Sequence, residues 1–107
     1  MKNLAVPNST HCPVAEASKI IGDFWNILII RELLKGCQRF NELQTNIEGM
    51  TNSTLSDRLK VLADEGIVLR RQYESIPPKV EYSLSAKGAG LRDLLKEIEA
   101  YGQQWMS

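Results

Sequence analysis

The stretch TNSTLSDRLKVLADEG, residues 51–66, decides the fold. Within it Leu55, Leu59 and Leu62 recur at helical spacing, which predicts an amphipathic helix with one buried stripe. Its first residue is a threonine, suited to an N-cap, and its last is a glycine, suited to the C′ position. The outward residues near its start are short and polar, which are the features of a helix that reads base edges in a DNA major groove.

The segments before this helix also predict helices. FNELQTNI, residues 40–47, predicts a short helix, and the glycine-containing turn 48–50 joins it to residues 51–66, which is the helix-turn-helix pattern. Further upstream, Pro13 suits the first turn of a helix that Gly22 ends. FWNILIIRELLKG, residues 24–36, is apolar nearly all round, which is typical of a helix at the centre of a core.

After Gly66 the hydrophobic period changes to that of strands. IVLRRQYES, residues 67–75, and KVEYSLS, residues 79–85, predict two strands joined by a proline turn, and such a hairpin after a helix-turn-helix is a wing, at about residues 67–84. Ser85 is then suited to cap a last helix over about residues 86–105. The predicted fold class is mainly α with a small β-hairpin wing, a winged helix-turn-helix.

The composition limits the function classes. With 107 residues, 43% of them apolar and 24% charged, the chain fits one globular domain that needs neither disulfide nor metal. The longest apolar run is broken by Arg31 and Glu32, and the N-terminus lacks a signal peptide, so we expect a cytoplasmic protein with no membrane contact. The net charge of zero argues against indiscriminate binding to nucleic acid, although a local basic edge could still bind DNA.

Catalysis and bound cofactors are not expected. The chain has one histidine, no paired nucleophile and base and no glycine-rich phosphate loop, so we do not expect an enzyme. His11, Cys12 and Cys37 lack the spacing of a zinc site, and no other cofactor is indicated.

The order of these segments resembles the HxlR-type winged helix-turn-helix regulators of bacteria, of the MarR-like group. The resemblance covers about residues 12 to 105. Each motif alone is a weak indication of the family, but the motifs in this order are specific to it. Its carriers are Cys12-Pro13-Val14, Ile21-Gly22, Trp25, ILIIRELLKG at 27–36, RFNEL at 39–43, Leu55 with Arg58-Leu59, PPKVEYSLS at 77–85, Gly88, Gly102 and Trp105.

The resemblance implies a homodimeric transcription factor that binds an inverted-repeat operator in double-stranded DNA. A flexible arm over residues 1–11 would precede a DNA-binding domain over residues 12–107. The residues expected to contact DNA are Thr51, Asn52, Ser53, Thr54, Ser56, Asp57, Arg58 and Lys60 of the reading helix, with Arg70, Arg71 and Lys79 of the wing. Since Arg70 and Arg71 are consecutive in a strand, they point to opposite faces and only one can face DNA.

The resemblance also places the dimer interface on the first and last helices. The apolar stripe of the last helix is longer than a small core needs, which independently favours a partner subunit. The residues expected at this interface are Val14, Ile21, Leu94, Leu95, Ile98, Tyr101 and Trp105.

Two positions depart from the usual pattern of the family. Asp23-Phe24 stands where a Gly-Lys pair is common, and Asp57 adds a carboxylate to the reading face. A carboxylate there repels phosphate but can accept a hydrogen bond from a cytosine amino group, so it can narrow the operator sequence.

Several members of this family sense oxidants or electrophiles through a cysteine at the position of Cys12. Free amides at a helix N-terminus favour a thiolate, and His11 could help when protonated. Many other members carry the cysteine with no sensing role, so sensor and bystander both stay open, and Cys37 is more simply an incidental thiol than a resolving partner. A small-molecule effector near Trp25 or Tyr101, and a protein-interaction module without DNA binding, are the remaining alternatives.

Overall fold

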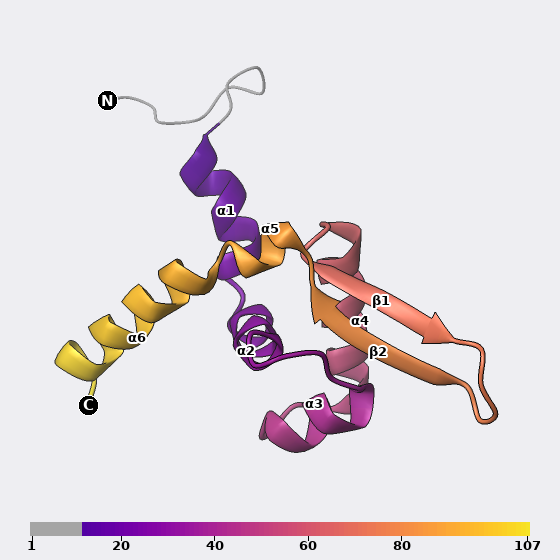
Figure 1. Ribbon diagram of the computed structural model, residues 1–107. Coiled ribbons are helices and arrows are strands. Elements are labelled where there is room, and N and C mark those ends of the chain that lie inside the picture. Colours follow the sequence, from indigo (N-terminus) through magenta and orange to yellow (C-terminus); the bar gives the residue numbers. More distant parts are fainter. Residues whose placement is uncertain (1–11) are drawn as a thin grey trace.

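The computed structural model describes residues 12–107, and it confirms the predicted fold class (Figure 1). The predicted flexible arm over residues 1–11 lies outside the described residues. The elements in chain order are α1 (Pro13–Ile21), α2 (Phe24–Leu33), α3 (Phe40–Asn46), α4 (Asn52–Asp64), β1 (Val68–Tyr73), β2 (Lys79–Leu84), α5 (Ala86–Ala89) and α6 (Arg92–Trp105).

The α2 helix is the centre of the core, as its nearly all-round apolar sequence predicts. Ile29, Ile30 and Leu33 are at most 3% exposed, and α1, α3, α4 and α6 all pack against this helix (Figure 1). Asp23 caps it, because its side chain accepts a hydrogen bond from the amide of Asn26. Leu43 of α3 is fully buried in the same core.

The wing is an antiparallel hairpin fastened to the body at its base. Its register pairs Val68 with Leu84, Arg70 with Tyr82 and so on outward along β1 and β2. Tyr82 also exchanges two backbone hydrogen bonds with Gln38, of 2.9 and 2.7 Å, so the loop between α2 and α3 pairs with β2 like a third strand. This pairing fixes the hairpin relative to the helix-turn-helix.

The prediction of a single last helix over residues 86–105 is wrong in one respect, because the structure divides this segment into α5 and α6. Ser85 caps α5 as predicted, its hydroxyl accepting from the amide of Gly88. Gly88 lies so close to the backbone of Ile67 that a Cβ there would collide with the carbonyl oxygen of that residue. Leu91 donates to the carbonyl of Gly88 rather than one residue further back, and this tighter turn separates the two helices.

No helix within residues 12–107 has both the length and the apolar character needed to cross a membrane.

Candidate nucleic-acid interface

The α4 helix is held rigidly by its apolar face. Leu55, Leu59 and Leu62 are 0 to 2% exposed. Thr51 is the N-cap, accepting from the amide of Thr54 at 3.1 Å, as predicted. At the other end Gly66 has a φ of 75°, and the hydrogen bonds from Gly66 to Ala63 and from Ile67 to Leu62 form a Schellman motif. The helix therefore has two defined ends and one fixed face.

The opposite face of α4 is a row of short polar side chains open to solvent. The exposed members are Thr51, Asn52, Ser53, Ser56, Asp57 and Lys60. Thr54 is half-buried, and the Thr51 hydroxyl donates to its hydroxyl at 3.0 Å. Because the row starts at the N-terminus of a helix, its exposed amides and hydroxyls can approach base edges or phosphates.

Arg58 does not point freely into solvent. Its Nη1 lies 3.1 Å from Oδ2 of Asp23, the N-cap residue of α2, and the two side chains are 28% and 35% exposed. Nothing in the sequence indicates this pair, which spans 35 positions. Of the predicted contact residues on α4, Arg58 is thus the one already bound to another part of the chain.

The three predicted basic residues of the wing divide between its two faces. Arg71 and Lys79 both lie over the ring of Tyr73, with 4.8 Å and 5.4 Å from their charged groups to the ring centroid. Arg70 alternates to the other face, beside Tyr82, which packs against the core. The structure therefore brings Arg71 and Lys79 together and separates Arg70 from them, as the strand periodicity predicts.

A small cluster of titratable groups lies on the face of the wing that carries Tyr73. The sequence did not predict this cluster. A hydrogen bond from Tyr73 lowers the pKa of the Glu81 carboxylate, and the same bond raises the pKa of Tyr73. Loss of solvent around the Cys37 thiol, together with its hydrogen bond to Glu81 and the charge of that carboxylate, raises the pKa of Cys37. Lys79 lies 3.5 Å from Glu81 and completes the cluster. A thiol with a raised pKa is less reactive, which agrees with an incidental role for Cys37.

Most of the residues predicted for the dimer interface are exposed. Val14 of α1 is 76% exposed, and Tyr101 and Trp105 of α6 are 63% and 66% exposed. Leu94 and Ile98 are exposed on the same stripe of α6. Two members differ, because Ile21 and Leu95 are half-buried and Leu95 packs against the core.

Cys12 is the N-cap residue of α1, and its side chain makes no capping hydrogen bond. The residue is half-buried, and its thiol is free. Its predicted neighbour in sensing, His11, lies outside the described residues. Trp25, considered for an effector site, packs edge-on against Phe24 and onto the core, whereas Tyr101 is exposed and lies near Trp105.

Comparison with known proteins agrees with this geometry. The family model for the HxlR-like helix-turn-helix matches residues 20–107. The uncharacterized HTH-type transcriptional regulator YvaP of Bacillus subtilis is 38% identical in sequence, over 92% of this chain and 92% of YvaP. The HTH-type transcriptional regulator YodB of the same organism is 36% identical, over 91% of this chain and 88% of YodB.

Solved structures of this type superpose closely. The oxidized form of the redox regulator HypR gives a TM-score of 0.83 at 32% identity, over 90% of this chain and 99% of that one. The reduced form of YodB gives 0.79 at 34% identity, over 92% and 97% of the two chains. These relatives are transcriptional regulators and not enzymes. The chain belongs to the HxlR-like helix-turn-helix family, and it is a winged-helix transcriptional regulator of the HxlR and MarR type.

Proposed function

We propose that the chain acts as a homodimeric, sequence-specific DNA-binding regulator in which each α4 enters a major groove of an inverted-repeat operator. The observation that carries the proposal is the contrast between the two faces of α4. One face is 0 to 2% exposed at its three leucines, and the other presents an open row of short polar side chains from its N-cap onward. A helix fixed on one side and polar on the other can keep hydrogen-bonding groups at base edges without losing their register.

The roles of the individual residues follow from their positions. Asn52, Ser53 and Ser56 would reach base edges or nearby phosphates, and Asp57 would accept from a cytosine amino group. Thr51 would act chiefly through the N-terminus that it caps, with Thr54 supplying the capped amide, while Lys60 would contact the phosphate backbone. On the wing Arg71 and Lys79 would hold phosphate beside the minor groove, and Arg70, on the other face, would contribute less.

The dimer would use the open apolar stripe of α6 together with Val14 of α1. Exposed aromatic residues such as Tyr101 and Trp105 are of the kind enriched in subunit interfaces. A two-fold dimer would place its two α4 helices on half-sites about one or two helical turns apart, roughly 34 to 36 Å per turn.

We further propose that Cys12 makes the regulator sensitive to oxidants. The support is the position of its free thiol at the start of α1, beside the proposed dimer surface, and the similarity to the redox regulator HypR and to YodB. Oxidation would join the Cys12 sulfur to a second thiol, and the oxidant would take up the two electrons and two protons released. A new covalent bond at this surface would change the separation of the reading helices.

The test is footprinting on the DNA upstream of the gene for this protein, with reduced protein and again after diamide. We expect a protected inverted repeat that is lost with diamide and retained by Cys12→Ser. Protection that is unchanged by diamide would contradict the sensing role of Cys12 but would still support a DNA-binding regulator.

A second arm separates DNA binding from a protein-interaction module. Charge reversal at Arg71 and Lys79 should abolish protection, whereas the control Lys87→Glu, on α5, should not. No protection by the wild-type protein at any low-salt condition would contradict DNA binding.

A further inference from the structure

A groove between α2 and α6 encloses about 590 Å³, a volume in the range of small-molecule sites. In Figure 1 α6 and the wing extend from α2 in opposite directions, so this groove lies away from the wing. Its floor is apolar and comes from both helices, with Ile27 and Leu28 on α2, Leu34 as the C-cap of α2, and Leu95 and Ile98 on α6. Neither Trp25 nor Tyr101 lines it, so it is not the effector site considered from the sequence.

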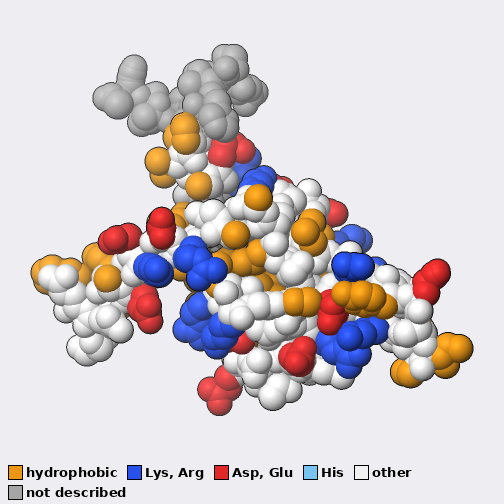
Figure 2. Space-filling view, in the orientation of Figure 1, with side chains coloured by type: hydrophobic (Ala, Val, Ile, Leu, Met, Phe, Trp, Pro, Cys, Tyr) orange, Lys and Arg blue, Asp and Glu red, His pale blue; other side chains and the backbone are white. Residues whose placement is uncertain are grey.

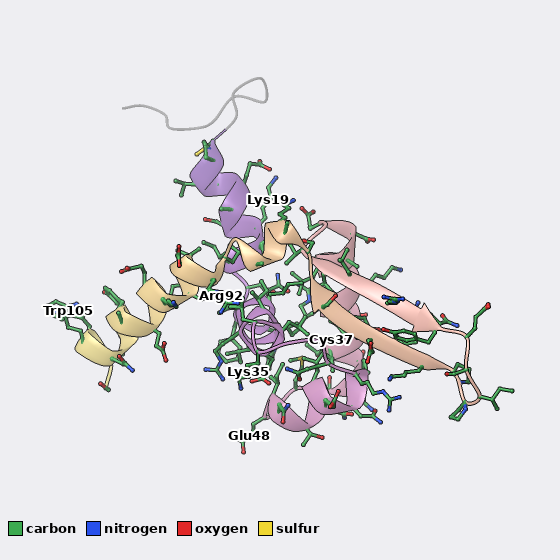
Figure 3. All side chains as sticks on the ribbon, in the orientation of Figure 1. Lys19, Lys35, Cys37, Glu48, Arg92 and Trp105 are labelled. Carbon is green, nitrogen blue, oxygen red and sulfur yellow. The ribbon has the colours of Figure 1, made fainter. Side chains whose placement is uncertain are left out.

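The walls of the groove carry an excess of positive charge. Arg31 stands on α2, Lys35 in the turn that follows it, and Arg92 and Lys96 on α6, and Glu99 is the one carboxylate among the lining residues. Figure 2 shows Lys and Arg side chains gathered where α6 meets the body, and Figure 3 labels Lys35 and Arg92 there.

Three of the four cations form no ion pair with another described residue. Lys35 is paired with the buried Glu32 at 2.7 Å, whereas Arg31, Arg92 and Lys96 form no ion pair within residues 12–107. Unpaired cations on both walls of an apolar groove are complementary to a molecule with an anionic head and an apolar body.

We propose that this groove binds a small amphipathic anion, with its apolar body on the floor and its carboxylate, sulfonate or phosphate between the cations of α2 and α6. The guanidinium groups of Arg31 and Arg92 suit such a head because each offers two parallel donors.

The charge and the geometry favour this occupant over segments of the chain itself. Residues 1–11 contain Lys2 and no acidic side chain, so they offer no complement to the cations. A second copy is expected on a different side of α6. Its exposed stripe runs through residues 94, 98, 101 and 105, and the groove uses 92, 95, 96, 98 and 99. At 100° per residue the mean directions of the two sets are roughly 120° apart, and they share Ile98 at their common edge.

Occupancy of the groove would affect the placement of α6. No residue of this helix is fully buried, and the turn at Gly90 and Leu91 separates it from α5. A molecule lodged between α2 and α6 therefore changes how the helix of the proposed dimer lies against the body that carries α4. This consequence rests on the proposed function, whereas the binding site itself does not.

The binding site is tested on free protein, with no DNA present, by fluorescence titration with 8-anilino-1-naphthalenesulfonate. We expect about one site per chain and at least tenfold weaker binding of N-phenyl-1-naphthylamine, the same molecule without its sulfonate. The double variant Arg92→Gln, Lys96→Gln should weaken the sulfonate by about tenfold or more and leave the neutral probe unchanged. Lys60→Gln, which removes one positive charge from α4, should change neither.

Equal affinity for the two probes, or an equal loss of binding in Lys60→Gln, would overturn the site. A second measurement addresses regulation: decanoate should displace the sulfonate and release operator DNA, and decanol should do neither. If DNA is bound but decanoate does not release it, the regulatory consequence is wrong while the site stands. If the protein binds no DNA at all, the proposed function fails and the probe titration still decides the site.

Discussion

Arg58 Nη1 lies 3.1 Å from Asp23 Oδ2, so a cation of the reading helix α4 is held by the residue that caps α2. The same carboxylate accepts from the amide of Asn26 through Oδ1 at 3.0 Å. Both partners of the ion pair are about one-third exposed, so the pair is partly screened and contributes at most about 1 kcal/mol. It stabilises the packing of α4 on α2 and at the same time removes one cation from the proposed DNA-binding surface.

The variant Asp23→Asn should separate these two effects. Asparagine keeps an N-cap acceptor but loses the charge, so the free energy of unfolding should fall by about 1 kcal/mol or less. Affinity for a non-specific duplex should rise by about two- to fivefold, because Arg58 is released and one negative charge is removed. Urea denaturation and fluorescence anisotropy measure the two quantities.

Asp93→Asn, which removes the same charge from α6, is the control for Asp23→Asn. If it raises DNA affinity as much, the gain is a general charge effect and Arg58 does not reach phosphate.

The variant Asp57→Asn should bind DNA more tightly and discriminate less between operator sequences. The exposed carboxylate repels phosphate, and in the proposed complex it accepts from a cytosine amino group, so its loss should strengthen binding to any duplex. Discrimination at one base pair of each half-site should fall by about 1 to 3 kcal/mol. Competition among operators with single base changes measures this.

Asp64→Asn, at the far end of the same helix, should raise general affinity without changing the ratios between operators. Unchanged discrimination in Asp57→Asn would show that this carboxylate does not contact a base.

The elements of this fold were predictable where one local signal decides them. The capped α4, the central α2 and the hairpin each have a distinct hydrophobic period and recognisable terminal residues, such as Thr51, Asp23 and the prolines of the turn. The division of the last helix was not predicted, and just before it Gly88 lies against the carbonyl of Ile67. A tertiary contact of that kind has no periodicity in the sequence.

The sequence predicted which residues form the candidate site, but it did not predict which of their side chains contact one another. The open row of α4 follows from helical spacing, whereas the Arg58–Asp23 pair and the Glu81 cluster join residues far apart in the chain. The groove between α2 and α6 was missed for the same reason, since its cations lie on two helices whose packing only the fold determines.

The salt dependence of DNA binding should distinguish the two faces of the wing. Lys79→Gln and Arg71→Gln should each reduce the slope of log affinity against log salt by about one, because each removes one proposed phosphate contact. Arg70→Gln, on the face beside Tyr82, should change the slope less. Titrations of one operator at several salt concentrations give the slopes. A larger change for Arg70→Gln would assign the opposite face of the wing to DNA.

A charge on the exposed stripe of α6 should separate the subunits. Trp105 is 66% exposed, and burying a carboxylate in its place is costly, so Trp105→Glu should weaken the dimer by about 2 kcal/mol or more. Light scattering should then report a mass near the single-chain value of 12.1 kDa, and the footprint should be lost with it.

Gln103→Glu places the same charge on the opposite side of α6 and should leave the dimer intact. Dissociation by both variants, or by neither, would show that the stripe through Trp105 is not the interface.

The carboxylate of Glu81 should slow the reaction of Cys37 with alkylating reagents. Loss of solvent, the hydrogen bond to this carboxylate and its charge raise the pKa of the Cys37 thiol, so at pH 8 little thiolate is present. Glu81→Gln keeps an acceptor but removes the charge, which lowers that pKa and should speed alkylation by about two- to fivefold. The measurement is the rate of iodoacetamide modification against pH in a Cys12→Ser background, with Glu74→Gln as the control. Because only the thiolate reacts, the variant should shift the pH profile to lower pH without changing its upper plateau. An unshifted profile would leave the loss of solvent as the dominant cause.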